Sequence, residues 1–113
     1  MSGPSSVVRT SGGIVTTDAQ IKVACGFKPA FVHVVNRTLG SSIVWNAGMP
    51  QDSGLRQSGV TLTTIFVTTS GITTYEDSTG EGFAINPVIG VNNNSASHPL
   101  YWAAFRGDGS PGN

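Results

Sequence analysis

Short runs of residues that alternate between two faces, each ended by Gly, Pro or Asn, recur along most of this chain. The runs cover residues 21–24, 31–35, 43–45, 60–69, 82–91 and 100–105. No window repeats apolar residues at helical spacing over three turns. Because successive side chains of a strand point to opposite faces, this period of two predicts strands and excludes long helices.

Two of the runs indicate how the strands pack. In the run 31–35 both alternating sets are largely apolar, which is typical of a strand at the centre of a sandwich. The run 60–69 is rich in β-branched residues and is the clearest strand signal, whereas Pro87 predicts an edge or a bulge. Many short strands joined by short loops predict an all-β fold, an antiparallel β-sandwich or jelly roll.

The length of 113 residues predicts one domain with flexible ends. Residues 1–13 mix Gly, Pro and Ser around Val7 and Val8, which predicts an N-terminal arm that becomes ordered on a partner surface. Residues 14–106 form the predicted β-sandwich domain, and residues 107–113 form a flexible polar tail.

The low charge of the chain narrows the classes of partner. Charged residues make up 11% of the sequence, and six basic side chains balance six acidic ones. A nucleic-acid binder normally carries a basic stripe, and an acidic membrane surface also attracts basic clusters, so neither partner is expected. Net charge near zero favours association between copies. The N-terminal residues lack a signal-peptide pattern, and we expect synthesis in a cytoplasm.

Catalytic and metal-binding groups are sparse. Cys25 is the only cysteine, and we expect it to be a small buried side chain. His33 and His98 have no metal-ligand partner at useful spacing, so they are interpreted as structural and loop residues. The acidic residues Glu76 and Glu81, with Asp77 between them, are typical of a solvated loop. We therefore expect no enzyme, no cofactor and no metal site.

Aromatic residues leave a second function open. Four aromatic residues could stack on sugar rings: Trp45, Tyr75, Tyr101 and Trp102. The amides of residues 92–94 could bind sugar hydroxyls. The same aromatic residues also lie in strand-like runs, where filling a core is the commoner role. A lectin-like or tail-fibre carbohydrate-binding module is thus the alternative function.

An ordered series of segments extends over residues 25–106. It reads GFKPAFVHVVNRT, IVWNAGMP, SGITTYED, GFAINPVIGVN and LYWAAFR. This series resembles small virion proteins of tailed bacteriophages that are encoded among capsid genes. The resemblance implies a jelly-roll decoration, or cement, protein that coats the outside of the phage head and clamps neighbouring capsomers.

The resemblance also implies partners and a location. The major capsid protein would be the main partner, the chain would form a homo-dimer or a homo-trimer, and it would reside on the capsid exterior. Dimers on two-fold axes and trimers on three-fold axes both suit such a clamp. Within the predicted arm, Val7, Val8 and Arg9 are the candidate capsid contacts.

Overall fold

A computed structural model describes residues 9–15, 19–78, 80–88, 91–92 and 98–106. The described residues contain strands and turns and no helix. A helix that could cross a membrane is therefore not found among them. The strands are β1 (Arg9–Val15), β2 (Ile21–Ala24), β3 (Phe31–Asn36), β4 (Ser42–Asn46), β5 (Ser53–Gln57), β6 (Thr64–Asp77), β7 (Gly80–Ile85) and β8 (Pro99–Phe105).

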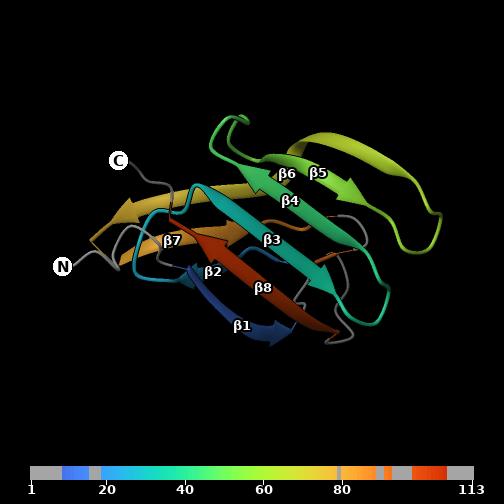
Figure 1. Cartoon of the computed structure of the whole chain (residues 1–113), viewed down its shortest axis with the longest axis horizontal. Helices are drawn as coiled ribbons and strands as arrows, with labels where there is room; N and C mark the ends of the chain where they lie inside the picture. Colours follow the sequence, from blue (N-terminus) through green and yellow to red (C-terminus); the bar gives the residue numbers. More distant parts are fainter. Residues whose placement is uncertain (1–8, 16–18, 79, 89–90, 93–97, 107–113) are drawn as a thin grey trace.

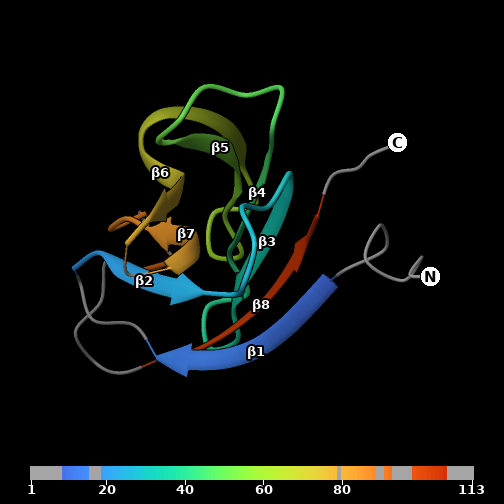
Figure 2. The same ribbon diagram turned by 90° about the vertical axis from the view of Figure 1, so that its left-hand side faces the viewer.

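All eight strands belong to one antiparallel sheet with the order β1-β8-β3-β4-β5-β6-β7-β2 (Figure 1). The sheet curls into a half-barrel, so that β7 and β2 face the inner side of β8 and β3 (Figure 2). The all-β prediction is confirmed. Hydrogen bonding joins the strands into a single curled sheet, and a division into two sandwich layers stays a prediction.

The core lies inside the curl and contains buried side chains of β2, β3, β4, β6, β7 and β8 and of the loops beside them. On β3, Val32 and Val34 are fully buried, whereas Phe31 and His33, which alternate with them, are exposed. The core side chains come from both ends of the sheet: Val23, Phe27, Val32, Val34, Ile43, Trp45, Ile72, Phe83, Ile85, Val88, Val91, Leu100 and Ala104. The strand 31–35 was interpreted as apolar on both sides, and within the described residues only the side with Val32 and Val34 is buried.

The long strand β6 turns the corner of the half-barrel. Its first part pairs with β5 and its second part with β7, and the register shifts at Ser53 and Gly54. At the corner the backbone of Gly71 lies so close to that of Ser53 that a Cβ would collide with the Ser53 carbonyl. Only glycine allows this approach, because it has no side chain.

A polar cluster holds the corner in shape. Asp52 Oδ1 accepts a hydrogen bond from Gly71 N at 3.0 Å and another from Asn86 Nδ2 at 2.6 Å. Asn86 Nδ2 also donates to the Gly71 carbonyl at 3.0 Å, and Gln20 Nε2 donates to Asn86 Oδ1 at 2.9 Å. These bonds add to the backbone bonds that Gly71 makes with Asp52 and Asn86, and they join three segments where the register shifts.

Four of the predicted strands lie where the pattern placed them: 21–24, 31–35, 43–45 and 100–105. The segment 82–91 forms β7 only to Ile85, because Pro87 cannot donate to a ladder. The strand predicted at 60–69 is displaced. The observed strand, β6, begins at Thr64, and Val60 and Leu62 lie in the loop before it.

The sequence pattern does not predict two of the strands, β1 and β5. β1 contains Gly12 and Gly13, and β5 contains Gly54 and three polar or charged residues, so neither shows a strong strand pattern. Both are strands because they pair with neighbours distant in sequence, β1 with β8 and β5 with β4 and β6. Tertiary pairing thus overrides weak local propensity.

The first strand begins inside the segment that we predicted as an arm. Residues 9–13 lie in β1, where Arg9 pairs with Phe105. Val7 and Val8 lie outside the described residues, as does the predicted tail 107–113. Any arm that precedes the sheet therefore ends at residue 8.

Candidate protein-binding site

The loop between β5 and β6 exposes two large apolar side chains. Val60 is 67% exposed and Leu62 is 85% exposed, the highest values among the large apolar residues of the described chain. The loop lies at the far end of the hairpin, away from the β7–β2 end of the sheet (Figure 1). We refer to residues 58–63 as the hairpin tip.

Hydrogen bonds hold the hairpin tip in one conformation. Ser58 N donates to the Thr63 carbonyl at 2.8 Å, and Leu62 N donates to the Ser58 carbonyl at 3.0 Å. The Ser58 hydroxyl oxygen accepts from Val60 N and Thr61 N at 3.3 and 3.1 Å. A serine side chain that bonds the following backbone is a common device for fixing a turn.

The tip is also fixed to the neighbouring loop between β3 and β4. Gly59 N donates to the Ser41 hydroxyl oxygen at 3.0 Å, and Gly59 lies against the backbone of Leu39 and Gly40. Leu62 has a φ of 59°, a left-handed conformation that costs a branched, bulky residue roughly 1–2 kcal/mol. An exposed apolar residue held with such strain is often functional.

The chemistry of the hairpin suits an apolar protein surface. Residues 57–75 contain no Asp, Glu, Lys, Arg or His, and they consist mainly of Thr, Ser and apolar residues. Because hydrogen bonds already fix the backbone of the tip, its backbone loses little conformational entropy on binding. The tip can therefore insert into an apolar pocket of a partner protein.

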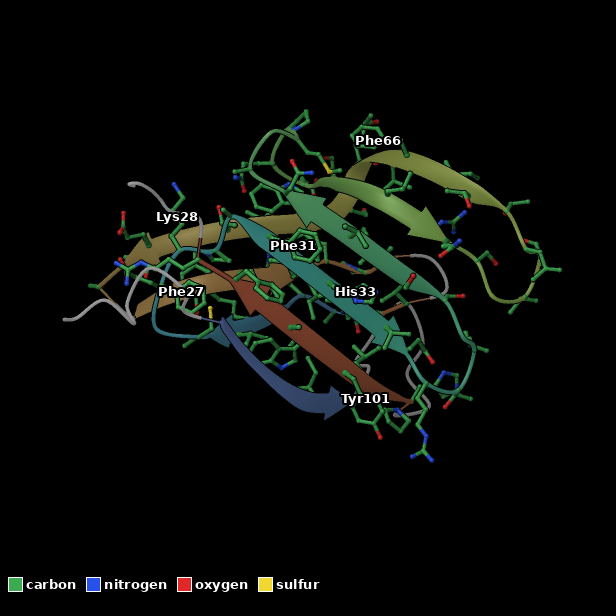
Figure 3. The ribbon with its side chains drawn as sticks, in the orientation of Figure 1. Phe27, Lys28, Phe31, His33, Phe66 and Tyr101 are labelled. Atoms are coloured by element: carbon green, nitrogen blue, oxygen red, sulfur yellow. The ribbon has the colours of Figure 1, made fainter. Side chains whose placement is uncertain are left out.

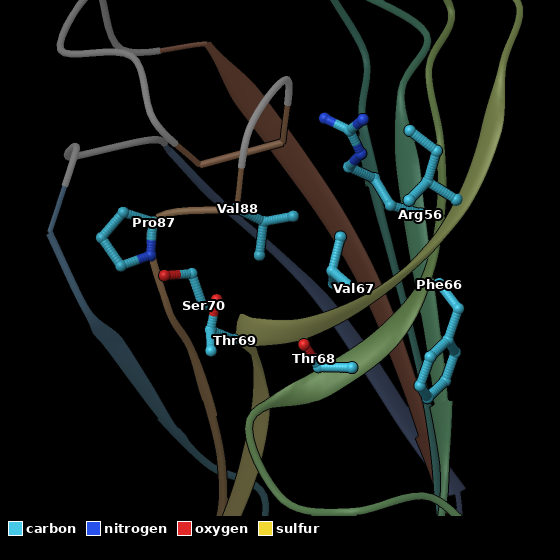
Figure 4. A pocket seen from close by; sticks show the side chains of 9 residues that line it. Arg56, Phe66, Val67, Thr68, Thr69, Ser70, Pro87 and Val88 are labelled. Atoms are coloured by element: carbon cyan, nitrogen blue, oxygen red, sulfur yellow. The ribbon is translucent and has the colours of Figure 1, made fainter.

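A shallow pocket of about 340 Å³ lies behind the hairpin, between the corner of β6 and the segment Pro87–Val88 (Figure 4). Its described lining includes Arg56 and the hydroxyls of Thr68, Thr69 and Ser70, whereas the Phe66 ring points away from Pro87. The described lining holds no carboxylate, histidine or cysteine. Nucleophilic or general acid–base chemistry therefore has no residue pair in this pocket.

The histidines and the cysteine lie in three different surroundings. His33 is exposed on the outer side of β3, and His98 Nδ1 lies 3.4 Å from Asn36 Nδ2 before β8. Cys25 is half-buried, its Sγ donates to the Phe27 carbonyl at 3.3 Å, and burial raises the pKa of its thiol. A thiol with a raised pKa is a poor nucleophile near neutral pH. Within the described residues, no group of three His, Cys, Asp or Glu could hold a metal.

The acidic residues of β6 and β7 form cross-strand contacts. Glu76 pairs directly with Glu81, and its hydrogen bond and negative charge raise the pKa of the Glu81 carboxyl. Asp77 Oδ2 lies 3.6 Å from Lys22 Nζ, whose ammonium group also covers the Tyr75 ring at 4.3 Å. Both glutamates lie at the end of the sheet beside the β6–β7 turn and away from the pocket at the β6 corner.

The predicted sugar-stacking residues do not form one exposed platform. Trp45 is buried and donates its Nε1 hydrogen to the Pro50 carbonyl at 2.9 Å. Trp102 is half-buried against Phe83, and the Lys22 ammonium group lies over one face of Tyr75. In this conformation the Trp45 ring has no free face for a sugar.

The residues of the hairpin tip were not identified in the sequence as a site. Val60 and Leu62 were interpreted there as one face of a strand, because their alternation matches that of a half-buried strand. The signal in the sequence was the pair Ser58-Gly59, a turn dipeptide directly before them. Of the arm candidates, only Arg9 falls among the described residues, as the first residue of β1.

Comparisons of this chain with protein-family models, with curated proteins and with solved structures find no match.

Proposed function

We propose that this chain is a structural virion protein that decorates and stabilises the outside of a bacteriophage capsid. The observation that carries the proposal is the hairpin tip, where Val60 and Leu62 are presented to solvent on a hydrogen-bonded turn. A clamp between capsomers needs a rigid body with fixed apolar contacts. It needs no catalytic group, cofactor or metal.

The resemblance to decoration proteins supports the same reading and implies a jelly-roll arrangement. In that arrangement the two halves of the curled sheet correspond to the two layers of a jelly roll. The major capsid protein is the proposed partner, and the virion exterior is the proposed location. We propose two contacts on the capsid, the hairpin tip and the segment that precedes β1, including Val7 and Val8.

Two modest contacts on one body bind a repetitive shell far more tightly than either alone. Once one contact has formed, the other binds at a high effective concentration. Loss of either contact should therefore weaken binding strongly without unfolding the domain.

The experiment measures cosedimentation of the purified chain with expanded heads assembled from the major capsid protein of the same genome. The variant V60D/L62D tests the tip, and deletion of residues 2–8 tests the arm and leaves β1 intact. S78D, an exposed change in the β6–β7 turn, is the matched control. We expect each of the two test variants to lose about tenfold or more in affinity, equivalent to about 1.4 kcal/mol or more, and S78D to bind as wild type.

Wild-type affinity of V60D/L62D for heads would refute the tip as a contact. A chain that does not bind heads but binds a specific sugar on a glycan array would favour the carbohydrate-binding module instead. The exposed Tyr101 ring would then be the first residue to test.

A further inference from the structure

The outer side of the sheet carries a second apolar surface. Cross-strand pairing places Phe66, Leu55, Val44, His33 and Ala103 in one row across β6, β5, β4, β3 and β8. Pairs in neighbouring rows place Phe31 beside Phe105 and Val35 beside Tyr101. We call these nine residues the outer apolar face.

The outer apolar face is exposed in the single chain. Tyr101, Phe66 and Leu55 are 46%, 45% and 42% exposed. In the view of Figure 3, Phe31 and His33 lie on β3 on the side that faces the reader. The Phe31 ring packs edge to face against Phe105, with centroids 5.5 Å apart.

This composition differs from that of a sheet face in contact with water. An antiparallel sheet with one solvated side normally carries polar residues on that side. Here β3 contributes Val32 and Val34 to the core and Phe31, His33 and Val35 to the other side. Contiguous exposed apolar surface of this kind marks a binding site.

We propose that the outer apolar face packs against the same face of a second copy of this chain. A two-fold interface brings each surface patch against its own copy, so charges in the patch would meet like charges. The nine residues of the face include no Asp, Glu, Lys or Arg, and His33 is the one titratable group among them apart from Tyr101. The face is thus complementary to itself.

The size of the face predicts a weak dimer. Five strands at about 4.8 Å spacing and rows of about five residues give a face of roughly 20 by 17 Å, which is roughly 340 Å² per copy. Two such faces bury roughly 700 Å² before the relief of the side chains is added. This area is below the roughly 1,200 Å² at the lower end of stable specific interfaces, so we expect a dimer that dissociates on dilution. Polar neighbours supply a rim, including Arg37, whose Nη1 donates to the Tyr101 hydroxyl at 3.3 Å.

This inference does not depend on the capsid role, because it concerns the free protein and uses a different surface from the hairpin tip. Sedimentation velocity and native mass spectrometry of the full chain test it over a dilution series. We expect wild type at twice the 11.7 kDa mass of the chain. H33E and L55E place like charges in the interface, and we expect each to weaken the dimer about 100-fold or more. S78E, the same kind of change outside the face, should leave the dimer unchanged.

Folding is checked by the circular dichroism spectrum and by the urea midpoint at dilutions where wild type is monomeric. A second measurement uses L55C in a C25S background, with T61C in C25S as control. The rate of thiol modification at position 55 should fall as protein concentration rises, whereas the rate at position 61 should stay constant.

Three results would overturn the proposal. The first is a wild-type chain that is monomeric at every concentration. The second is a dimer that H33E and L55E leave intact. The third is a trimer, because three copies cannot pair this face with itself around a two-fold axis.

Discussion

Phe83 on β7 and Trp102 on β8 pack edge to face, with ring centroids 5.3 Å apart and planes inclined by 70°. Their strands do not pair, since β8 is second in the sheet and β7 is seventh. The contact therefore crosses the interior and joins the two ends of the sheet. Among the described residues, contacts made by side chains join the two ends of the sheet here: this ring pair and the buried hydrogen bond from Asn36 Nδ2 to the Val91 carbonyl.

The first prediction concerns this contact. F83A removes a fully buried ring, and we expect it to lower the free energy of unfolding by about 3–5 kcal/mol. F66A removes an exposed ring on β6 and should cost less than about 1 kcal/mol in the monomer. Urea unfolding of dilute protein measures both. Equal losses in the two variants would contradict a core that lies inside the curl.

The second prediction concerns Asn92, which is fully buried after β7. Its Nδ2 donates to the Ala19 carbonyl at 2.7 Å and to the Ile85 carbonyl at 3.2 Å, and so links the end of β7 to the start of β2. N92A removes these buried hydrogen bonds together with the amide that makes them, and it should lower the free energy of unfolding by about 2–3 kcal/mol.

The matched control for N92A is N46A. Asn46 is exposed, and its Oδ1 accepts one turn hydrogen bond from Gly48 N at 2.8 Å. Its loss should cost about 1 kcal/mol or less. Thermal and urea unfolding compare the two variants, and a control that is as damaging as N92A would show that burial of the amide is unimportant.

The third prediction is a pH dependence at the Glu76–Glu81 pair. The hydrogen bond from Glu76 raises the pKa of Glu81 above its ordinary value of 4.5, with burial and repulsion from Glu76 adding to the effect and Arg106 opposing it. A carboxyl whose pKa is raised on folding stabilises the fold at low pH. This stabilisation is lost as pH rises through the folded pKa.

E81Q removes this titration and the repulsion across the strands. We expect E81Q to be more stable than wild type at neutral pH. The difference in stability should shrink as the pH falls and vanish below the ordinary carboxyl pKa of 4.5. D77N should be less stable than wild type at neutral pH, because it loses the exposed ion pair with Lys22. Thermal midpoints across a pH series test both directions, and a constant offset between E81Q and wild type would rule out the proposed coupling.

The fourth prediction separates stability from binding at the hairpin tip. Asn tolerates a left-handed φ better than Leu, so L62N should raise the free energy of unfolding by about 0.5–1 kcal/mol. The same change removes the most exposed apolar side chain and should weaken binding to heads. V60N is the control, because Val60 is not among the described residues with positive φ, and it should give no gain in stability.

Much of the fold could be predicted from local patterns. The alternation in 31–35 correctly separates Val32 and Val34 from Phe31 and His33, because strand geometry sends alternate side chains to opposite sides. The missed strand β5 shows the limit of local patterns, since Gly54 and Arg56 are poor strand signals and become part of the sheet only through β4 and β6. Pairing between distant segments is a property of the whole fold.

The candidate site was harder to predict for a related reason. The alternation of Val60 and Leu62 with Thr61 and Thr63 is the same whether the segment packs on a core or projects into solvent. Exposure depends on what lies opposite, and the described residues leave the side chains of Val60 and Leu62 largely uncovered. The exposure of Val60 and Leu62 therefore depends on where the fold places the hairpin, at the end of the sheet.

By itself the sequence determined that this protein is built of short strands, that β3 is apolar on both sides, and that Gly and Pro end the strands. Period-two alternation and turn residues act locally, so they can be read without knowing the partners. Only the tertiary structure decided that the eight described strands form one curled sheet and that the other described residues leave its second apolar side exposed. Strand order and burial depend on contacts between distant residues, which no local pattern contains.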